Sequence, residues 1–323
     1  MVSSIEEPRQ IKTDEHTIKS GWLEVGHGHK VWYEQWGNKD ASVPVLYFHG
    51  GPGGGYKPSH KYNLDPKKHQ AIIFDQRGCG NSLPYGRTDH NRTEDLINDA
   101  LMILDELGVK KVHIQGGSWG STLALLFAIK HPEKCQDLVI RGVFTGTQSE
   151  INWIDKGLFI NHYPEVWERF LGTVPAENRS KPAEYHYEIL NGSDPENFQT
   201  SAKALSELEG PLLAFDWPGF NDIQLDNKPN DMPEEFDFVP YKIFAWYLSH
   251  SCFLSESYIL KNASKINCPL FIIQGRYDMC CPPITAYKIH KLVKNSKLFM
   301  TLASHSNDPE TRSVNQALIQ TIY

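Results

Sequence analysis

Short apolar runs alternate with helical patterns through the first 145 residues, and the same alternation returns after about residue 263. This alternation is typical of a mostly parallel sheet, because parallel neighbours need a crossover connection that is usually a helix. One such helix is expected over Thr93–Leu107, where apolar residues share a face and Gly108 provides the stop. The sequence therefore predicts an α/β fold with a twisted sheet flanked by helices. The expected strands are 30–35, 43–48, 70–74, 112–115, 137–143, 270–274 and 297–302.

The segment between these two halves has a different composition. Strand-like runs are missing from residues 146–262, and we predict that this segment is a mainly helical cap inserted into a core formed by residues 1–145 and 263–323. Its tryptophans either pack into the cap's own core or roof a cleft beneath it. They are Trp153, Trp167, Trp217 and Trp246. Residues 225–241, rich in proline, aspartate and asparagine, are expected to form a long loop.

Charge and composition exclude several classes of partner. The formal net charge of −7 and the lack of a basic stripe argue against nucleic acid. The charged amino terminus has no apolar signal region, and no apolar run reaches the roughly 18 residues of a membrane span. We therefore expect a cytoplasmic protein with six reduced cysteines and no membrane partner. No Rossmann glycine pattern, H-E-x-x-H motif or clustered Cys/His set is present, so no cofactor and no metal are expected.

The stretch VHIQGGSWGSTLALLFAIKHP reads as a strand, a sharp turn and a helix, with the pattern G-x-S-x-G centred on Ser118. This pattern is typical of a nucleophile elbow, whose turn lifts the serine hydroxyl above the sheet edge. The alternative is a Gly-Ser turn with an unreactive hydroxyl. An elbow serine needs an acid and a histidine, which follow it in that order. Asp278 and His305 each follow a predicted strand, so we expect Ser118, Asp278 and His305 to form a catalytic triad at the carboxyl edge of the sheet.

A second glycine-rich stretch, FHGGPGGG, follows the strand predicted over 43–48. The bare backbone N–H groups of such a loop serve either a phosphate cradle or an oxyanion hole. The Gly-Lys-Ser/Thr ending of a phosphate loop is missing, which favours the oxyanion hole. We predict that its donors are the backbone N–H groups of Gly51 and of Trp119, the residue after the nucleophile.

Two further stretches are less decisive. In IIFDQRGCGNS, Asp75 and Arg77 are expected to form a structural ion pair that braces the neighbouring loops, rather than to contact a substrate. Cys280 and Cys281 lie two and three residues after Asp278 and are expected to be packing residues. An accessible thiol at either position would instead let a bulky thiol reagent disturb the triad.

With these motifs identified, the chain resembles the proline iminopeptidases (prolyl aminopeptidases) of the α/β-hydrolase superfamily. The stretches HGGPGGG, DQRGCGNS, GGSWGSTLAL, GRYDMCCP and a final histidine motif stand in the family's order. The similarity runs from about residue 20 to residue 306, dense in the core and sparse in the cap. It implies the α/β-hydrolase fold and the same triad and oxyanion donors that the residues alone predict.

The resemblance also implies a substrate. The family releases an N-terminal proline from peptides, and its cap offers glutamates to the free amine. Glu209 matches the first of these glutamates, although a solvated helix acid would give the same pattern. Ser249 stands where the family has the second glutamate, so the chain departs from the pattern there. Amine recognition would then weaken, be abandoned for an uncharged substrate, or shift to one of the acids Asp216, Asp226 and Glu256.

Three functions stay open at this point. The leading hypothesis is a serine exopeptidase that releases an N-terminal proline, or another small residue, from short peptides through an acyl-enzyme intermediate. The second keeps the triad but acts as an esterase, lactonase or amidase on an uncharged small molecule. The third is a non-catalytic binding protein, which a complete triad disfavours. Epoxide hydrolases and dehalogenases are excluded because they need an aspartate at the elbow, where this chain has Ser118.

Overall fold

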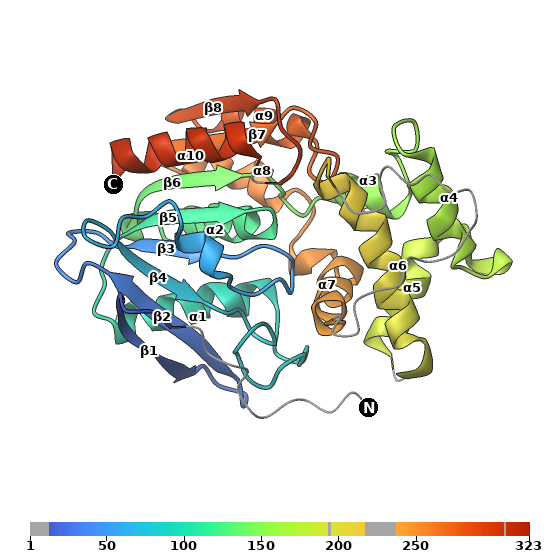
Figure 1. The fold of residues 1–323 in the computed structure, drawn as a ribbon, viewed down its shortest axis with the longest axis horizontal. Coiled ribbons are helices and arrows are strands. Elements are labelled where there is room, and N and C mark those ends of the chain that lie inside the picture. The colour runs from blue at the N-terminus through green and yellow to red at the C-terminus, as the bar shows by residue number, and fades with distance from the viewer. Residues whose placement is uncertain (1–12, 193–194, 217–236, 307) are drawn as a thin grey trace.

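The structure, a computed structural model, describes residues 13–192, 195–216, 237–306 and 308–323 (Figure 1). Its centre is an eight-stranded sheet in the order β1-β2-β4-β3-β5-β6-β7-β8. The pairs β1 with β2 and β2 with β4 are antiparallel, and all other pairs are parallel. The strands are β1 (Thr17–Glu24), β2 (Lys30–Gly37), β3 (Val45–Phe48), β4 (Gln70–Phe74), β5 (Val112–Gly117), β6 (Cys135–Arg141), β7 (Leu270–Gly275) and β8 (Ser296–Thr301).

Seven of these strands confirm the sequence prediction to within a few residues, and β1 is the strand that the prediction lacks. Its sequence, TIKSGWLE, contains no apolar run, and its side chains are exposed or only partly buried. β1 lies at the edge of the sheet and pairs with β2. An edge strand of this kind leaves little hydrophobic signal in a sequence.

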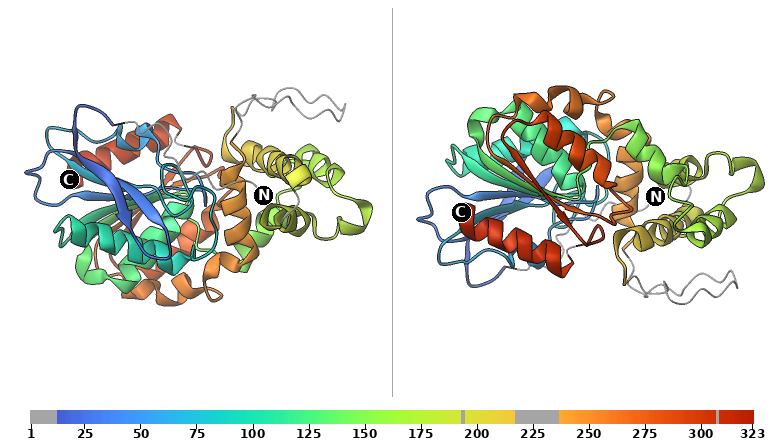
Figure 2. Two further views of the ribbon diagram at one scale, coloured as in Figure 1. Left: turned by 90° about the horizontal axis from the view of Figure 1, so that it is seen from below. Right: turned by 90° about the horizontal axis from the view of Figure 1, so that it is seen from above.

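Four helices cover the two faces of the sheet: α1 (Thr93–Glu106), α2 (Trp119–Lys130), α9 (Pro283–Leu292) and α10 (Pro309–Ile322) (Figure 2). Ile289 of α9 belongs to the main hydrophobic core, whereas Ile319 of α10 belongs to a smaller core cluster. The strands supply the two clusters alternately, since Ile72 lies in the main core and Ile73 in the smaller one. This alternation is the period of two that a strand buried on both faces requires.

The helices α1 and α2 are specified in different ways. Every residue of α2 from Trp119 to Ile129 is buried, as expected for a helix that is apolar all round. The amphipathic α1 begins where the Arg92 N–H donates to Asp95 Oδ2 at 2.9 Å. It stops before Gly108, whose φ of +67° is a left-handed conformation that favours glycine. The helix predicted over residues 93–107 is thereby confirmed.

Between β6 and β7, the residues that the structure describes form helices joined by loops and turns, without a strand. Figure 1 shows α4 to α7 beyond the carboxyl ends of the parallel strands, whereas α8 packs against α2 and α9 of the core. The cap limits predicted at residues 146 and 262 stay a prediction. The helices of this segment are α3 (Gln148–Asp155), α4 (Pro164–Gly172), α5 (Pro182–Asn191), α6 (Pro195–Leu213), α7 (Val239–Ser249) and α8 (Tyr258–Asn262).

Two tryptophans anchor this helical region to the core. The indole N–H of Trp153 in α3 donates to the carbonyl oxygen of Met279, after β7, at 2.7 Å. The indole N–H of Trp246 in α7 donates to the carbonyl oxygen of Asn91, before α1, at 2.8 Å. Both rings therefore combine apolar packing with a hydrogen bond that fixes the position of their helix.

A third tryptophan contributes to the core of the helical region itself. Trp167 in α4 packs against Phe159 and Phe170, with ring centroids 5.9 and 5.6 Å away. Trp217, together with residues 225–236 of the predicted loop, lies outside the described residues. Internal packing is therefore confirmed for Trp167, whereas Trp153 and Trp246 bind the core instead, and a role of tryptophans in roofing a cleft stays a prediction.

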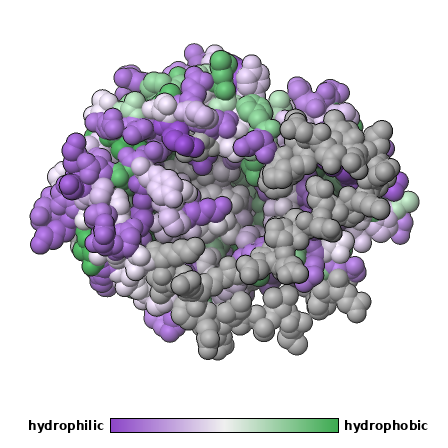
Figure 3. All heavy atoms as spheres, viewed as in Figure 1, coloured by the Kyte–Doolittle hydropathy of each residue, from purple (hydrophilic) through white to green (hydrophobic). Residues whose placement is uncertain are grey.

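The described part of the surface shown in Figure 3 is mainly hydrophilic, and the chain carries a formal net charge of −7. Hydrophilic side chains dominate the described part of the face in Figure 3, and apolar side chains appear there singly or in small groups. Among the residues that the structure describes, no helix combines the length and the apolar character needed to span a membrane.

The ion pair predicted in the DQRG stretch forms with a different acid. Arg77 Nε and Nη2 donate to the two carboxylate oxygens of Asp99 in α1, at 2.7 and 2.6 Å, and both side chains are buried. Asp75 instead accepts the backbone N–H groups of Tyr56, at 2.6 Å, and Asn81, at 2.8 Å. The structural role of Arg77 is confirmed, but the prediction that Asp75 is its partner is wrong. The prediction paired Arg77 with Asp75 because the two are close in sequence, but the Arg77 side chain points toward Asp99 in α1.

The buried pair predicts a large effect of one substitution. Asp99→Asn leaves the Arg77 guanidinium buried without its counter-charge, so we expect the free energy of unfolding to fall by about 3–5 kcal/mol in urea denaturation. The matched control is Glu184→Gln, which breaks the exposed pair of Lys181 and Glu184. It should leave the unfolding midpoint nearly unchanged, since exposed pairs contribute little. Equal, small effects of the two substitutions would contradict a stabilising role for the buried pair.

Candidate active site

Ser118 occupies a strained turn between β5 and α2. Its φ of 57° and ψ of −128° form a conformation that residues with a side chain rarely adopt. The flanking glycines are required by close contacts. A Cβ at Gly116 would lie 2.3 Å from the carbonyl oxygen of Gly120, and a Cβ at Gly120 would lie 2.1 Å from that of Phe48. The chain thus forms the sharp elbow that G-x-S-x-G predicts, with the Ser118 side chain partly exposed.

Asp278 and His305 are hydrogen-bonded to each other at the ends of β7 and β8. His305 Nδ1 lies 2.8 Å from Asp278 Oδ2, and both side chains are buried. The Asp278 carboxylate also accepts the backbone N–H groups of Cys280 and Cys281, at 3.1 and 2.7 Å, and the side-chain amide of Gln274, at 3.0 Å. These bonds fix the carboxylate, which can then hold the imidazole in one orientation.

The end of β6 lies between Ser118 and His305. The Ser118 N–H donates to the carbonyl oxygen of Arg141 at 3.0 Å, and Arg141 Nη1 donates to the carbonyl oxygen of His305 at 3.2 Å. A Cβ at Gly142 would lie 2.7 Å from Cε1 of His305, so glycine leaves the imidazole its place. These contacts bring all three predicted triad residues together at the carboxyl edge of the sheet.

The glycine run after β3 passes beside the elbow. A Cβ at Gly50 would lie 3.4 Å from Cβ of Ser118. Gly51 has a φ of +124°, and a Cβ there would lie 2.5 Å from the backbone nitrogen of Gly53, so only glycine fits. The second predicted donor, Trp119, begins α2 directly after Ser118. Both residues lie where oxyanion donors belong, and their role in catalysis stays a prediction.

A buried glutamine joins these two predicted donors. Gln76 Nε2 donates to the carbonyl oxygen of His49 at 2.9 Å, and Gln76 Oε1 accepts the indole N–H of Trp119 at 3.0 Å. The backbone N–H of Gln76 donates to His49 Nε2 at 3.0 Å. One side chain therefore ties the loop that carries Gly51 to the residue that follows the nucleophile. No motif in the sequence points to this role of Gln76.

His49 is neutral in this network. Its Nε2 accepts from Gln76, and its Nδ1 lies 2.8 Å from the carbonyl oxygen of Gly50, which requires the proton on Nδ1. Burial lowers the pKa of His49 to about 4, so the ring stays uncharged at neutral pH. Both ring nitrogens are engaged, and His49 is not available as a general base.

Glu209 lies in the helical region, close to His305 of the predicted triad. It lies near the C-terminal end of α6, close enough to His305 and to Tyr241 of α7 for their charges to interact. Burial raises the pKa of Glu209 to about 7, an effect that the neighbouring His305 partly offsets. Its side chain is partly exposed. A carboxylate in this position is suited to pair with a cation that enters beside His305.

Ser249 lies apart from this group. It is exposed at the C-terminal end of α7, where its hydroxyl accepts the Asn191 side-chain amide at 3.0 Å and donates to the carbonyl oxygen of Trp246 at 3.3 Å. The next turn is tightly wound, since residues 251, 252 and 253 have φ values of 50°, 54° and 52° in the left-handed region. The predicted role of Ser249 in substrate binding stays a prediction.

Of the acids proposed to replace the second cap glutamate, the described ones point elsewhere. Glu256 Oε2 accepts the backbone N–H of Gln148 at 3.1 Å on the surface, and Asp216 is exposed. Asp226 lies outside the described residues. Within the described chain, Glu209 is the cap acid whose charge interacts with His305.

Comparison with known proteins assigns the chain to a family. Residues 43–306 match the family model described as alpha/beta hydrolase fold. The chain belongs to the alpha/beta hydrolase family. The hydrolase is 36% identical over 291 residues to a probable proline iminopeptidase of Leptolyngbya boryana, covering 89% of this chain and 88% of the relative. It is 34% identical to the proline iminopeptidase of Neisseria meningitidis serogroup B, covering 88% and 90%. These relatives place it in the proline iminopeptidase family.

Solved structures agree with this fold. MGS-M2, an alpha/beta hydrolase enzyme from a deep-sea metagenome library, aligns with a TM-score of 0.62 at 18% identity over 94% of this chain and 96% of that chain. The proline iminopeptidase of Mycobacterium smegmatis aligns with a TM-score of 0.57 at 18% identity over 94% and 97%. At such identities the likeness concerns the fold alone.

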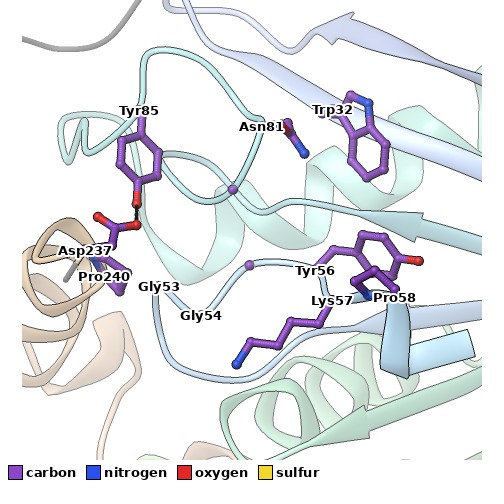
Figure 4. Close-up of a pocket in the computed structure, with 12 residues that line it drawn as sticks. Trp32, Gly53, Gly54, Tyr56, Lys57, Pro58, Asn81, Tyr85, Asp237 and Pro240 are labelled. Carbon is purple, nitrogen blue, oxygen red and sulfur yellow. Dashed lines mark hydrogen bonds between the residues drawn. The ribbon is translucent and has the colours of Figure 1, made fainter. Parts of the chain in front are cut away.

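The hydrolase also has a pocket of about 290 Å³ beside its glycine run (Figure 4). At one side of it the Tyr85 hydroxyl donates to Asp237, just before α7, as the dashed line in Figure 4 marks. A Cβ at Gly53 would lie 2.4 Å from the carbonyl oxygen of Pro240, so the run packs directly against the start of α7. The glycine run thus meets α7 of the cap region as well as the elbow.

Three features of the site were not predicted from the sequence. Gln76 and Gln274 both use side-chain amides to hold catalytic candidates, and amides follow no spacing rule. The third is that Cys280 and Cys281 lie close to His305, although Cys281 and His305 are 24 positions apart in the chain. The position of the two glutamines in the sequence could have indicated their role. Gln76 follows β4 and Gln274 lies near the end of β7, both at the carboxyl edge of the sheet, where ligands bind in α/β folds.

The Gln76 network predicts a catalytic effect without a change in the triad. Gln76→Met keeps the volume but removes both side-chain hydrogen bonds, so the two predicted oxyanion donors lose their common support. We expect kcat on a p-nitrophenyl ester to fall on the order of 10²-fold, because displacements of about 1 Å are that costly. KM should change by less than about threefold, since ground-state contacts are unaffected. A boronic acid, whose tetrahedral serine adduct needs the same donors, should bind correspondingly more weakly.

The matched control is Gln70→Met. Gln70 begins β4 at the opposite edge of the sheet, is also buried, and donates to the carbonyl oxygen of Asn38 at 3.3 Å. It should lose stability without losing kcat. Equal loss of kcat in both variants, or unchanged boronic acid binding in Gln76→Met, would show that Gln76 has a structural role only.

Proposed function

We propose that this hydrolase is a serine exopeptidase that releases an N-terminal proline, or another small residue, from short peptides. The observation that carries the proposal is the position of Glu209 close to His305, whose Nδ1 is held by Asp278. A free N-terminal ammonium bound to Glu209 would place the first peptide bond of the substrate next to the nucleophile. The relatives named proline iminopeptidases support the same function.

In the proposed mechanism, His305 accepts the hydroxyl proton of Ser118 as the serine oxygen attacks the carbonyl carbon of the first residue. Asp278 holds the imidazole and stabilises the charge that it gains. The N–H groups of Gly51 and Trp119 stabilise the oxyanion of the tetrahedral intermediate. Collapse of that intermediate transfers the proton from the imidazole to the leaving amine and leaves a prolyl ester on the serine. Water, activated by the same histidine, hydrolyses the ester and releases free proline.

The carboxylate of Glu209 explains why the proposed reaction needs a substrate with a free amine. An ammonium that leaves water for the cleft needs an opposite charge, and an unpaired one costs several kcal/mol. A peptide that extends beyond the amine would have to displace the carboxylate. Glu209 therefore selects the end of a chain and excludes internal bonds.

One observation favours a second function, hydrolysis of an ester, lactone or blocked amide. Ser249, in place of the family's second glutamate, is exposed and hydrogen-bonded to Asn191. A cap with one acid binds an ammonium less strongly than a cap with two. Aminoacyl arylamides and acyl esters, each with a free and a blocked amine, distinguish the two functions. Turnover that is indifferent to the blocking group would favour the second.

Glu209 predicts a pH dependence specific to free amines. Its carboxyl has a pKa of about 7 and is ionised above that value, so it becomes neutral as the pH falls through 7 and the substrate ammonium loses its partner. We expect kcat/KM for proline arylamide to fall below about pH 7 in addition to any decline caused by the base. In Glu209→Gln, kcat/KM at pH 8 should be about 10²–10³-fold lower, and this additional decline should disappear.

Two controls isolate this effect. A p-nitrophenyl ester without an amine should be hydrolysed at nearly the same rate by the parent and by Glu209→Gln, which reports on the triad alone. Glu207→Gln changes the same residue type in the same helix, beside Lys203 rather than the triad, and should behave like the parent. If Glu209→Gln loses ester and arylamide turnover in equal proportion, Glu209 does not bind the substrate amine.

A further inference from the structure

The triad histidine shares its surroundings with two thiols. One ligand atom from each of Cys280, Cys281 and His305 lies within 4.8 Å of the other two. All three side chains are buried, with 8%, 4% and 7% of their surface exposed. Both cysteines are free thiols. The sequence predicted no metal site because His305 follows on the next strand, far from the cysteine pair in the chain.

Backbone contacts fix this arrangement. The turn after β7 wraps around Asp278, whose Oδ1 accepts the N–H groups of both cysteines. Gln274 Nε2 donates to the carbonyl oxygen of Cys281 at 3.0 Å and so closes the turn. Adjacent side chains normally diverge along an extended chain, but here the two sulfur atoms lie within 4.8 Å of each other. The pair is therefore preorganised before any ligand binds.

Two thiols and an imidazole form a ligand set that suits a soft divalent cation. Zn²⁺ takes cysteine sulfur and histidine nitrogen in tetrahedral sites, and open sites keep water in the fourth position. If His305 binds the cation through Nε2, the carboxylate of Asp278 on Nδ1 matches the outer-shell partner that metal-bound histidines commonly have. We propose that Cys280, Cys281 and one ring nitrogen of His305 bind zinc or a similar soft cation, and that the bound cation switches off hydrolysis.

The chemistry balances without an oxidant or reductant. Two thiol protons pass to solvent as two sulfur–metal bonds form, and the imidazole donates one lone pair. If that lone pair belongs to Nε2, the base can no longer accept the proton of Ser118; if it belongs to Nδ1, the hydrogen bond to Asp278 is lost. The inhibitory part of the proposal rests on the proposed catalytic role of His305, whereas the binding part does not.

Two measurements test the site. Titration of the purified protein with Cd²⁺ should produce a thiolate-to-metal absorption band in the ultraviolet that is weaker in Cys280→Ser and in Cys281→Ser. Ester hydrolysis in buffered free Zn²⁺ should be half-inhibited at a concentration at least about tenfold lower for the parent than for either variant, each compared with its own metal-free rate. A chelator should restore activity. Thermal unfolding confirms that each variant is folded.

Cys268→Ser is the matched control. It removes one member of the other neighbouring thiol pair, Cys135 and Cys268, and should keep both the Zn²⁺ inhibition and the Cd²⁺ response at the proposed site. Equal zinc sensitivity of the parent and both site variants would overturn the proposal, as would a cadmium band that neither variant weakens. A band with no inhibition would show that His305 is not a ligand. A parent without hydrolase activity would contradict the proposed function, while the cadmium band would still test the binding site.

Discussion

The backbone conformation of Ser118 is the constraint on which the rest of the site depends. A residue with a side chain holds a strained, positive φ there, and it can do so because β3, β5 and α2 press together around Gly116 and Gly120. The carbonyl oxygen of Phe48 leaves no room for a Cβ at Gly120. The strain is therefore carried by close packing of buried elements, which is the usual condition for strain to persist at a functional site.

The order of the sheet converts this local constraint into a site. β3, β5, β6, β7 and β8 are successive parallel neighbours, so the loops at their carboxyl ends form one continuous edge. The glycine run, the elbow, Arg141–Gly142, Asp278 and His305 follow one another along it. Each is fixed by hydrogen bonds within the core, whereas the cap region contributes Glu209 from outside. In the proposed mechanism, the catalytic geometry therefore belongs to the core and the choice of substrate to the cap, a division that suits a fold used for many reactions.

Much of this arrangement was predictable because it follows from where strands end. Ser118, Asp278 and His305 each follow a strand, and a parallel sheet gathers such residues at one edge. Contacts between side chains distant in sequence were not predictable in the same way. Asp99 pairs with Arg77 only because α1 lies beneath the DQRG loop. The same limit applies to the cap. The surroundings of Ser249, which stands where the family has its second glutamate, depend on how α7 ends and turns.

Release of free proline from a short peptide tests the proposed exopeptidase activity without a chromogenic substrate. Pro-Gly-Phe and its N-acetylated form are incubated with the parent enzyme and with Ser118→Ala, and free proline is followed by mass spectrometry. The expected result is release of proline from the unblocked peptide alone, at a rate that falls by roughly 10⁵–10⁶-fold in the variant. Equal cleavage of both peptides, or release by Ser118→Ala within about tenfold of the parent, would contradict a serine exopeptidase that reads the free amine.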